Sequence, residues 1–229
     1  MKLISTILSL IIILTINAQN YVNSSFAFLN IPVSAKQLAL GSDIITLKED
    51  NNSTNLINNP SLISENVNKN ISLSHTIPFH KVNMSNITCP FVIKKYNLFA
   101  GLQYVNYGKF AETDITGTEL GNFRATDYSF VIGTAKHLDS SFTLGINIKL
   151  LVSSIYSYNS TGISTNAGIS YNNKKNKLII SLLMRNYGKQ IKTYNNDNNK
   201  QKLPLEYHIG IAKSMKNAPF SLYINISNI

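Results

Sequence analysis

Charged residues are scarce in this sequence. Asp, Glu, Lys and Arg make up 14% of its 229 residues, whereas they make up about 25% of an ordinary soluble domain. The shortage favours a protein with a surface that faces lipid, because charge on such a surface is costly. The formal net charge is +10, but the basic residues are spread over predicted turns. Because there is no basic helix and no aromatic RNA-binding motif, we expect no nucleic-acid partner.

Cysteine and histidine patterns that bind metals are also lacking. Cys89 is the only cysteine, which excludes an internal disulfide framework and a thiolate metal site. The histidines are His75, His80, His137 and His208. They have no metal-ligand spacing with carboxylates or with one another, so we expect no metal site among them.

Catalytic motifs are missing as well. Glu112, Asp114 and Glu119 form an acidic group, but they lack the ordered spacing and the glycine of a calcium-binding loop. The sequence contains neither a Gly-x-Ser-x-Gly elbow nor a phosphate-binding loop. We therefore expect no catalytic residues, no cofactor and no enzymatic activity.

The one long hydrophobic run lies at the N-terminus. It extends from Leu3 to Ile16 after the basic start Met1-Lys2, which is typical of a signal peptide and short for a membrane span. We expect residues 1–18 to be a signal peptide cleaved after Ala18. No later stretch offers 18 uninterrupted apolar residues, which disfavours a helical membrane protein. Export without a helical anchor leaves the periplasm, the outer membrane or the medium.

What the sequence does have is strict alternation of apolar and polar residues. Residues 142–150 read FTLGINIKL, and 163–171, 205–211 and 220–226 follow the same pattern. Side chains of a strand alternate between its two faces, so each stretch predicts a strand with one apolar face. A soluble β-sandwich hides that face behind a second sheet. Because a signal peptide precedes the strands, we favour a transmembrane β-barrel, with the apolar side toward lipid and the polar side toward a lumen.

The alternation predicts nine strands after a head that lacks it. The predicted strands are 71–79, 83–93, 98–107, 125–136, 142–153, 163–172, 178–187, 205–214 and 220–228. Within the head, residues 32–41 predict a short helix ended by Gly41. Residues 58–62 predict a turn into a second helical stub. The mature chain of about 210 residues fits one domain.

The predicted connections alternate in length. Residues 94–97 and 137–141 are short connections, whereas 108–124 and 188–204 are long, which is typical of periplasmic turns and external loops. A closed bacterial barrel has an even number of strands and returns both ends to the periplasm. Nine strands leave the last one ending outside, so we expect residues 71–229 to be an incomplete, C-terminally truncated barrel.

Individual side chains can be assigned to surfaces of this barrel. Tyr107 and Tyr187 stand where strands enter long connections, so we expect them in the aromatic girdle. The lumen-facing candidates, on polar faces of their strands, are Asn147, Lys149, Glu206 and His208. A water-filled lumen predicts that arginine at Asn147 is tolerated, whereas arginine at the lipid-facing Ile146 is not.

Several segments resemble one family. They are FLNIPVSAKQLALG (28–41), NNPSL (58–62), QYVNYGKF (103–110), RNYGKQIKTY (185–194) and KNAPF (216–220). The first two resemble the N-terminal signature of the PorV/PorQ proteins, and the other three resemble the PorQ members in particular. These are outer-membrane components of the type IX secretion system of Bacteroidetes. Ser42 departs from the family, which commonly has a second glycine after the equivalent of Gly41.

The resemblance implies a fold and a function. The fold is a barrel akin to the fatty-acid transporter FadL, with residues 19–70 folded as a plug inside, and family chains continue beyond the equivalent of Ile229. The implied role is non-enzymatic: to anchor secretion or cargo-attachment machinery at the outer membrane. Expected partners are outer-membrane lipid and other type IX components, a PorZ-like protein among them. The alternatives are a FadL-type transporter of hydrophobic small molecules and a secreted soluble β protein.

Overall fold

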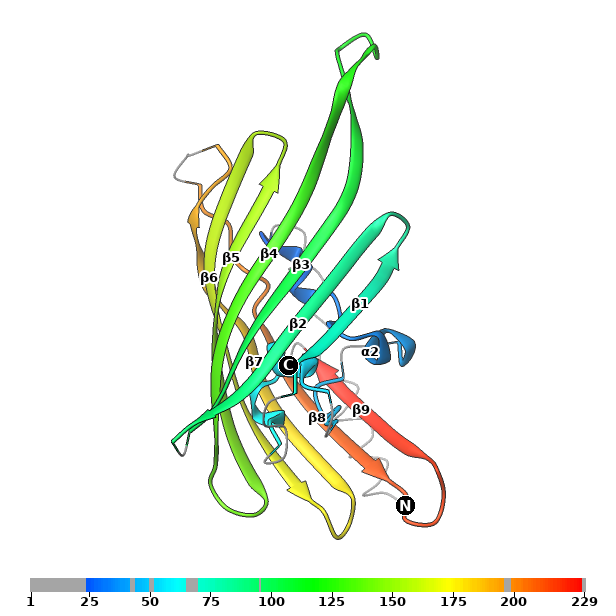
Figure 1. Ribbon diagram of the computed structural model, residues 1–229, viewed down its shortest axis with the longest axis vertical. Coiled ribbons are helices and arrows are strands. Elements are labelled where there is room, and N and C mark those ends of the chain that lie inside the picture. The colour runs from blue at the N-terminus through cyan, green and yellow to red at the C-terminus, as the bar shows by residue number, and fades with distance from the viewer. Residues whose placement is uncertain are drawn as a thin grey trace, which may run out of the picture.

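The computed structural model describes residues 24–41, 44–49, 52–64, 70–94, 96–195 and 199–227. The predicted signal peptide, with its cleavage point after Ala18, lies outside these residues. Within them, nine antiparallel strands form one sheet in chain order (Figure 1). They are β1 (Ser72–Phe79), β2 (Val82–Ile93), β3 (Tyr96–Thr113), β4 (Glu119–His137), β5 (Phe142–Ile155), β6 (Tyr158–Asn173), β7 (Leu178–Lys192), β8 (Glu206–Ser214) and β9 (Ser221–Ser227). The fold is all-β, and each of the nine predicted strands is confirmed.

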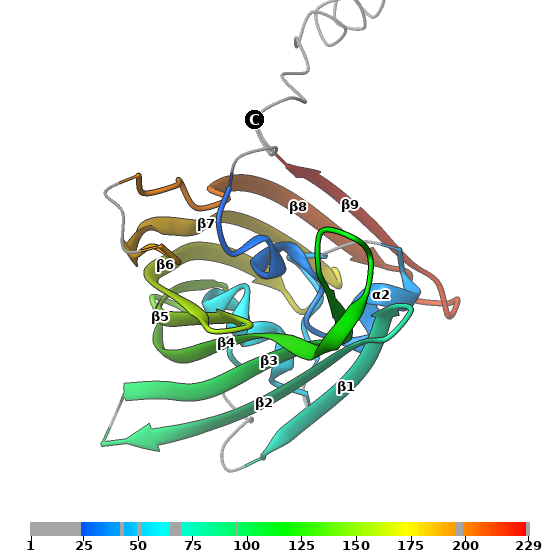
Figure 2. The same cartoon turned by 90° about the horizontal axis from the view of Figure 1, so that it is seen from above.

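The sheet curves around the N-terminal part of the chain, as the view from above shows (Figure 2). We call the described residues between 24 and 64 the plug and the nine strands the wall. The edges of the wall are β1 and β9, which are not paired with each other within the described residues. Helix α2 (Ala35–Ala39) of the plug lies against β1 at this opening.

The two faces of the wall differ in polarity. In β5, the predicted alternation is confirmed: Asn147 on the inner face is 1% exposed, whereas Ile146 on the outer face is 47% exposed. The same contrast continues in β6, because Leu144 and Leu150 of β5 pair with Ile169 and Ile163 of β6 on the outer face. Exposed apolar side chains of several strands thus share the outer face, whereas the inner face carries buried polar and buried apolar side chains.

The hydrophobic core lies between the plug and the wall. One cluster joins Val33, Leu56, Ile57, Leu62 and Ile63 of the plug to Phe99, Val131 and Ala135 of β3 and β4. A second cluster joins Phe26, Phe28 and Leu29 to Met84, Val105, Leu151 and Leu203. Burying one such side chain contributes about 1.5–3 kcal/mol. The wall therefore obtains its inner apolar contacts from the plug rather than from a second sheet.

The plug has little regular structure. The predicted helix at 32–41 is confirmed in part as α2, where Ser34 accepts a hydrogen bond from the Gln37 backbone N–H and Gly41 follows with a φ of 77°. The predicted stub at 58–62 is confirmed as the 3-10 helix η3 (Pro60–Leu62). Two more 3-10 helices are η1 (Ala27–Asn30) and η2 (Thr54–Ile57). Among the described residues, no helix has the length and hydropathy needed to span a membrane.

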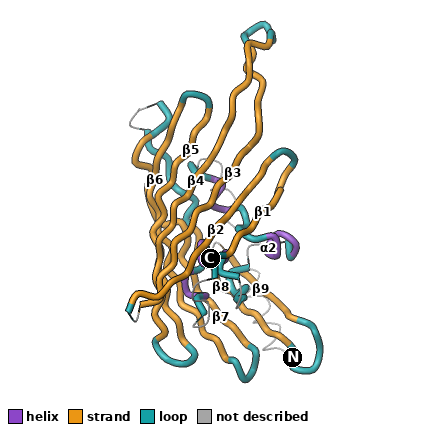
Figure 3. The backbone as a smooth tube through the Cα atoms, viewed as in Figure 1, coloured by secondary structure: helices purple, strands orange, loops and turns teal. Residues whose placement is uncertain are grey.

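The predicted short connections at 94–97 and 137–141 are confirmed, whereas the first of the two predicted long connections is not (Figure 3). Residues 108–124 are not a long loop, because β3 continues to Thr113 and β4 begins at Glu119. The register shifts between Asn106 and Lys109, and beyond that shift Phe110 stacks on Phe123 with ring centroids 5.4 Å apart. The connection between β5 and β6 is a turn at 156–157. Strand extension thus replaces the predicted long loop at 108–124, whereas the one predicted at 188–204 is confirmed in part, between Lys192 of β7 and Glu206 of β8.

Candidate functional site

The site with the densest polar contacts is the interface between the plug and the wall. Asn147 of β5 donates from Nδ2 to the carbonyl oxygens of Leu56 and Ile57, at 3.3 and 3.0 Å. Asn166 of β6 donates from Nδ2 to the carbonyls of Ile57 and Asn58, at 3.2 and 2.8 Å. Neighbouring strands therefore bind consecutive carbonyl groups of the plug.

The asparagines also bind one another across the strands. The Oδ1 of Asn147 accepts from the Asn166 backbone N–H at 3.2 Å, and the Oδ1 of Asn166 accepts from the Asn186 backbone N–H at 2.9 Å. Asn186 of β7 in turn donates to the Pro204 carbonyl at 3.2 Å. These three side chains, which we call the asparagine ladder, are at most 1% exposed. A buried amide without its partners costs about 1–3 kcal/mol, so the ladder fixes the position of the plug.

Serine hydroxyls make a second connection, nearer η3. The Oγ of Ser61 lies 2.6 Å from the Oγ of Ser170 on β6, which lies 2.6 Å from the Oγ of Ser181 on β7. At the other side of the hollow, Asn86 of β2 donates to the Val33 carbonyl at 2.7 Å. The plug is thus hydrogen-bonded to strands far apart in the wall.

Glycines allow the plug to approach the wall closely. A Cβ atom at Gly145 of β5 would lie 2.4 Å from the carbonyl carbon of Pro60 and 2.4 Å from the Ser61 backbone nitrogen. A Cβ at Gly210 of β8 would lie 2.6 Å from the Cγ1 of Ile45. Neither position has room for a side chain, because plug atoms occupy it. The backbone of the plug therefore rests directly on the backbone of the wall.

Charged groups are buried at the same interface. Arg185 of β7 donates to the Oε2 of Glu206 on β8, through Nε at 3.0 Å and through Nη2. The Nε2 of His208 lies 2.9 Å from the same carboxylate oxygen. Lys149 is fully buried, and its Nζ has no hydrogen-bond partner among the described residues. Removing one member of a buried ion pair leaves an uncompensated charge, which costs about 3–5 kcal/mol.

Electrostatic contacts within the plug are weaker and more exposed. Lys36 of α2 donates from Nζ to the Oε1 of Glu49 at 2.8 Å. This hydrogen bond raises the pKa of the lysine, against the opposite effect of its partial burial. Because Lys36 is half exposed, the pair contributes little to stability.

The structure places the predicted lumen residues together. Asn147, Lys149, Glu206 and His208 all lie buried on the inner face, between 0% and 7% exposed. They do not face an open lumen, however, because all four are buried, and Asn147 is bonded to the plug. The expectation that arginine is tolerated at Asn147 therefore loses its physical basis, since the Asn147 amide is bonded to the plug.

The two tyrosines expected in the aromatic girdle lie on opposite faces. Tyr187 is 61% exposed on the outside of β7, where a girdle residue would lie. Tyr107 points inward, which corrects the prediction. Its hydroxyl donates to the Oδ2 of Asp127 at 2.6 Å, and its ring packs on the buried cluster around Phe28. The cause is its register: Tyr107 precedes the shift at Gly108 and keeps the inward parity of Val105.

Asn166, Asn186 and Gly145 are the site residues that sequence reasoning missed. The signal was present, because Asn166 and Gly145 stand at inward positions of alternating strands. Chemically, the arrangement can hold a segment in place by hydrogen bonds and ion pairing. Among the described residues, no group of three or more His, Cys, Asp or Glu side chains is placed to hold a metal ion. No family model matches the sequence, and no curated protein matches it.

Proposed function

We propose that this protein is a non-enzymatic outer-membrane component of the type IX secretion system, of the PorV/PorQ kind, which anchors secretion or cargo-attachment machinery at the cell surface. The observation that supports an anchoring role is the fixed plug. The asparagine ladder, the serine contacts and the close approach at Gly145 tie the plug to β5 and β6. A rigid body in the membrane suits a scaffold for other proteins, and the pathway itself rests on the family resemblance.

The outer face of the wall supports the membrane location. Large apolar side chains on it are about half exposed, among them Phe130, Ile132, Ile146, Ile148 and Leu182. Soluble monomers rarely expose contiguous apolar patches larger than a few hundred Å². Contact with lipid would cover these apolar side chains. The predicted signal peptide supports export of the protein toward the outer membrane.

The two alternatives are less well supported. A FadL-type transporter of hydrophobic small molecules needs a continuous apolar path through the lumen. The inner face instead carries Asn147, Lys149, Asn166 and Glu206, with the plug bonded across it. A secreted soluble β protein needs a second layer over its apolar face, and the described residues contain a single sheet.

The experiment is a deletion of the gene scored for two activities. An anchoring component of secretion predicts that exported proteins stay in the periplasm or leave the surface unattached, while uptake of a labelled fatty acid stays normal. Re-expression of the gene is the control. Normal cargo with impaired uptake would replace the secretion proposal with the transporter.

Two biochemical measurements accompany the deletion. The mature protein should fractionate with the outer membrane and resist extraction by alkaline washing. The tagged protein, purified from membranes, should carry other type IX components with it, a PorZ-like protein among them. Wholly soluble protein would contradict the membrane location.

A further inference from the structure

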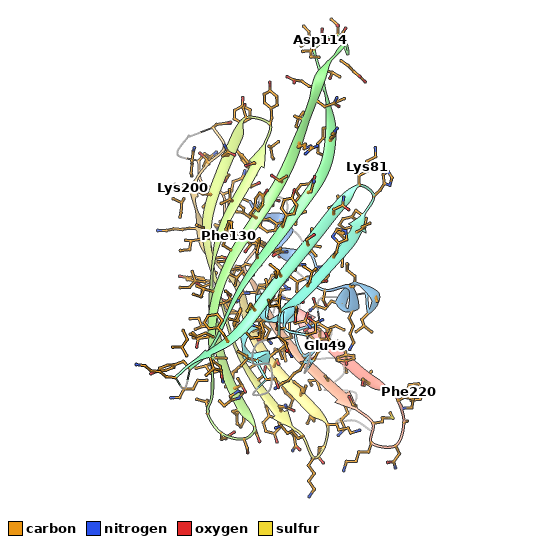
Figure 4. The ribbon with its side chains drawn as sticks, in the orientation of Figure 1. Glu49, Lys81, Asp114, Phe130, Lys200 and Phe220 are labelled. Carbon is orange, nitrogen blue, oxygen red and sulfur yellow. The ribbon has the colours of Figure 1, made fainter. Side chains whose placement is uncertain are left out.

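The hairpin formed by the end of β3 and the start of β4 stands above the rest of the wall. We call residues 109–124 the rim hairpin; Asp114 marks its tip (Figure 4). β2 pairs with β3 only as far as Asn106, and β5 pairs with β4 only from Ala125. Beyond these points the hairpin pairs only with itself, apart from a hydrogen bond from Tyr156 N–H to the Arg124 carbonyl.

The exposed apolar side chains change face in the rim hairpin. Lower in the wall, the exposed apolar side chains lie on the outer face, and the inner apolar ones are buried against the plug. Above the register shift, Phe110 and Phe123 lie on the inner face, where their rings stack. The ring of Tyr156 packs edge-to-face against the ring of Phe123, with the ring centroids 5.9 Å apart. Lys109 and Arg124 lie on the outer face. Because the outer face is charged here, we place this hairpin outside the lipid. Its aromatic face lies on the same side of the sheet as the plug.

That aromatic face is exposed, and hydrogen bonds close the tip of the hairpin. Phe110 is 43% and Tyr156 57% exposed. At the tip, the Oδ1 of Asp114 accepts from the Thr116 hydroxyl at 2.7 Å and from the Thr118 backbone N–H at 2.9 Å. These bonds hold the pKa of the Asp114 carboxyl below its usual range. The carboxylate is therefore charged at neutral pH.

The charge of the rim hairpin is opposite to that of the chain. The chain carries a formal net charge of +10, whereas residues 109–124 contain Glu112, Asp114 and Glu119 against Lys109 and Arg124, a formal net charge of −1. Both cations lie on the outer face, at the base of the hairpin. An aromatic centre with a charged rim is the usual anatomy of a protein interface. Complementary charge on a partner increases its rate of association and its specificity.

We propose that Phe110 and Phe123 on the inner face of the rim hairpin, together with Tyr156 of the neighbouring β5–β6 turn, form a docking surface for a soluble protein segment that presents an apolar side chain beside lysine or arginine. The hairpin's carboxylates favour such a segment over the anionic head groups of lipids. The inference adds a surface to the anchoring role and rests on that proposed function only for the identity of the partner.

The first test is photo-crosslinking in the native host. A benzoylphenylalanine residue replaces Phe110 on the inner face or Asn122 on the outer face, and crosslinked peptides are identified by mass spectrometry. The proposal predicts that Phe110 captures a segment in which an apolar residue neighbours a basic one, while Asn122 does not. Equal capture at both positions, capture of lipid alone, or capture of a second copy of this chain would overturn it.

The second test uses paired variants of the whole protein. Phe110→Ser with Phe123→Ser should weaken binding of the captured protein by about tenfold or more, since buried aromatic residues dominate interface energies. Lys109→Ser with Asn122→Ser changes the same strands on the outer face and should leave binding within about twofold, as expected for residues outside the contact. Equal effects of the two pairs would overturn the docking surface, provided that both proteins reach the membrane in equal amounts.

A charge-altering variant and the gene deletion complete the test. Glu112→Gln should reduce the salt dependence of binding, because Glu112 shares the inner face with Phe110 and charges at the edge of an interface act mainly on association; an unchanged salt dependence would contradict the charge argument. If the deletion abolishes cargo attachment and the Phe110→Ser, Phe123→Ser variant does not, the docking surface is wrong and the proposed function stands. If the deletion leaves cargo attachment intact, the proposed function fails, and crosslinking at Phe110 still decides the docking surface.

Discussion

Removing one amide from the asparagine ladder should loosen the plug measurably. Asn166→Ala deletes two donated hydrogen bonds, to the carbonyls of Ile57 and Asn58, and one accepted from the Asn186 backbone N–H. Each such bond contributes about 0.5–1.5 kcal/mol net. The sum is about 1.5–4.5 kcal/mol, and burial of the orphaned carbonyls favours the upper half of that range.

The isosteric change Asn166→Asp sharpens the prediction. It keeps the shape of the side chain and the hydrogen bond accepted from the Asn186 backbone N–H, but replaces the donor amide with a carboxylate oxygen that faces two carbonyl oxygens. A buried charge held against two acceptors costs more than a missing amide, so Asn166→Asp should destabilise the protein more than Asn166→Ala. Thr165→Val is the matched control, because Thr165 is the neighbour on the outer face.

The assay is unfolding of the purified protein in detergent micelles, by denaturant, combined with limited proteolysis of the plug. We expect the free energy of unfolding to fall in the order Thr165→Val, Asn166→Ala, Asn166→Asp, with faster cleavage of the plug in the last two. A loss below about 0.5 kcal/mol for Asn166→Ala, less than the contribution of one hydrogen bond, would refute the reasoning.

Three further changes test other parts of the structure. Gly145→Ala places a Cβ 2.4 Å from plug backbone atoms and should cost about 1–3 kcal/mol by overpacking, measured by the same unfolding assay. Ile146→Arg should cost about 2–4 kcal/mol in lipid bilayers if the residue lies near the midplane, whereas Ile146→Leu should cost little; equal effects would contradict a lipid-facing position. Glu206→Ala leaves Arg185 buried without its partner and should cost about 3–5 kcal/mol. The double variant Arg185→Met, Glu206→Met should recover much of that loss, and no recovery would contradict the ion-pair argument.

The sequence was sufficient to predict the strands, because alternation is a local signal. In β5 the apolar Ile146 lies on the outer face and the polar Asn147 on the inner face, as the alternation predicts. The contents of the hollow could not be predicted from the residues in the same way. The plug has no periodicity, and its position depends on contacts between distant residues, such as Asn166 with Asn58.

The errors share that non-local origin. Tyr107 is predicted in the aromatic girdle because it stands where a strand enters a long connection. In the structure β3 continues past Tyr107, and the register shift beyond it leaves Tyr107 on the inner face. The stretch after Gly108 contains charged and small residues that suggest a loop. In the structure, Phe110 pairs with Phe123 and the two strands continue. The sequence of either strand alone does not indicate this pairing.

The central claim, that the plug is a fixed part of the protein while it works, can be tested by locking it to the wall. In a Cys89→Ser background, Ser61→Cys with Ser170→Cys places two thiols where the hydroxyl oxygens lie 2.6 Å apart, close enough for a disulfide. Ser61→Cys with Ile169→Cys is the control, because Ile169 belongs to the outer face. On the proposed function, we predict that the first pair crosslinks in living cells and that the locked protein still supports attachment of exported proteins. Absence of the crosslink, or an activity that returns only when the disulfide is reduced, would contradict the account.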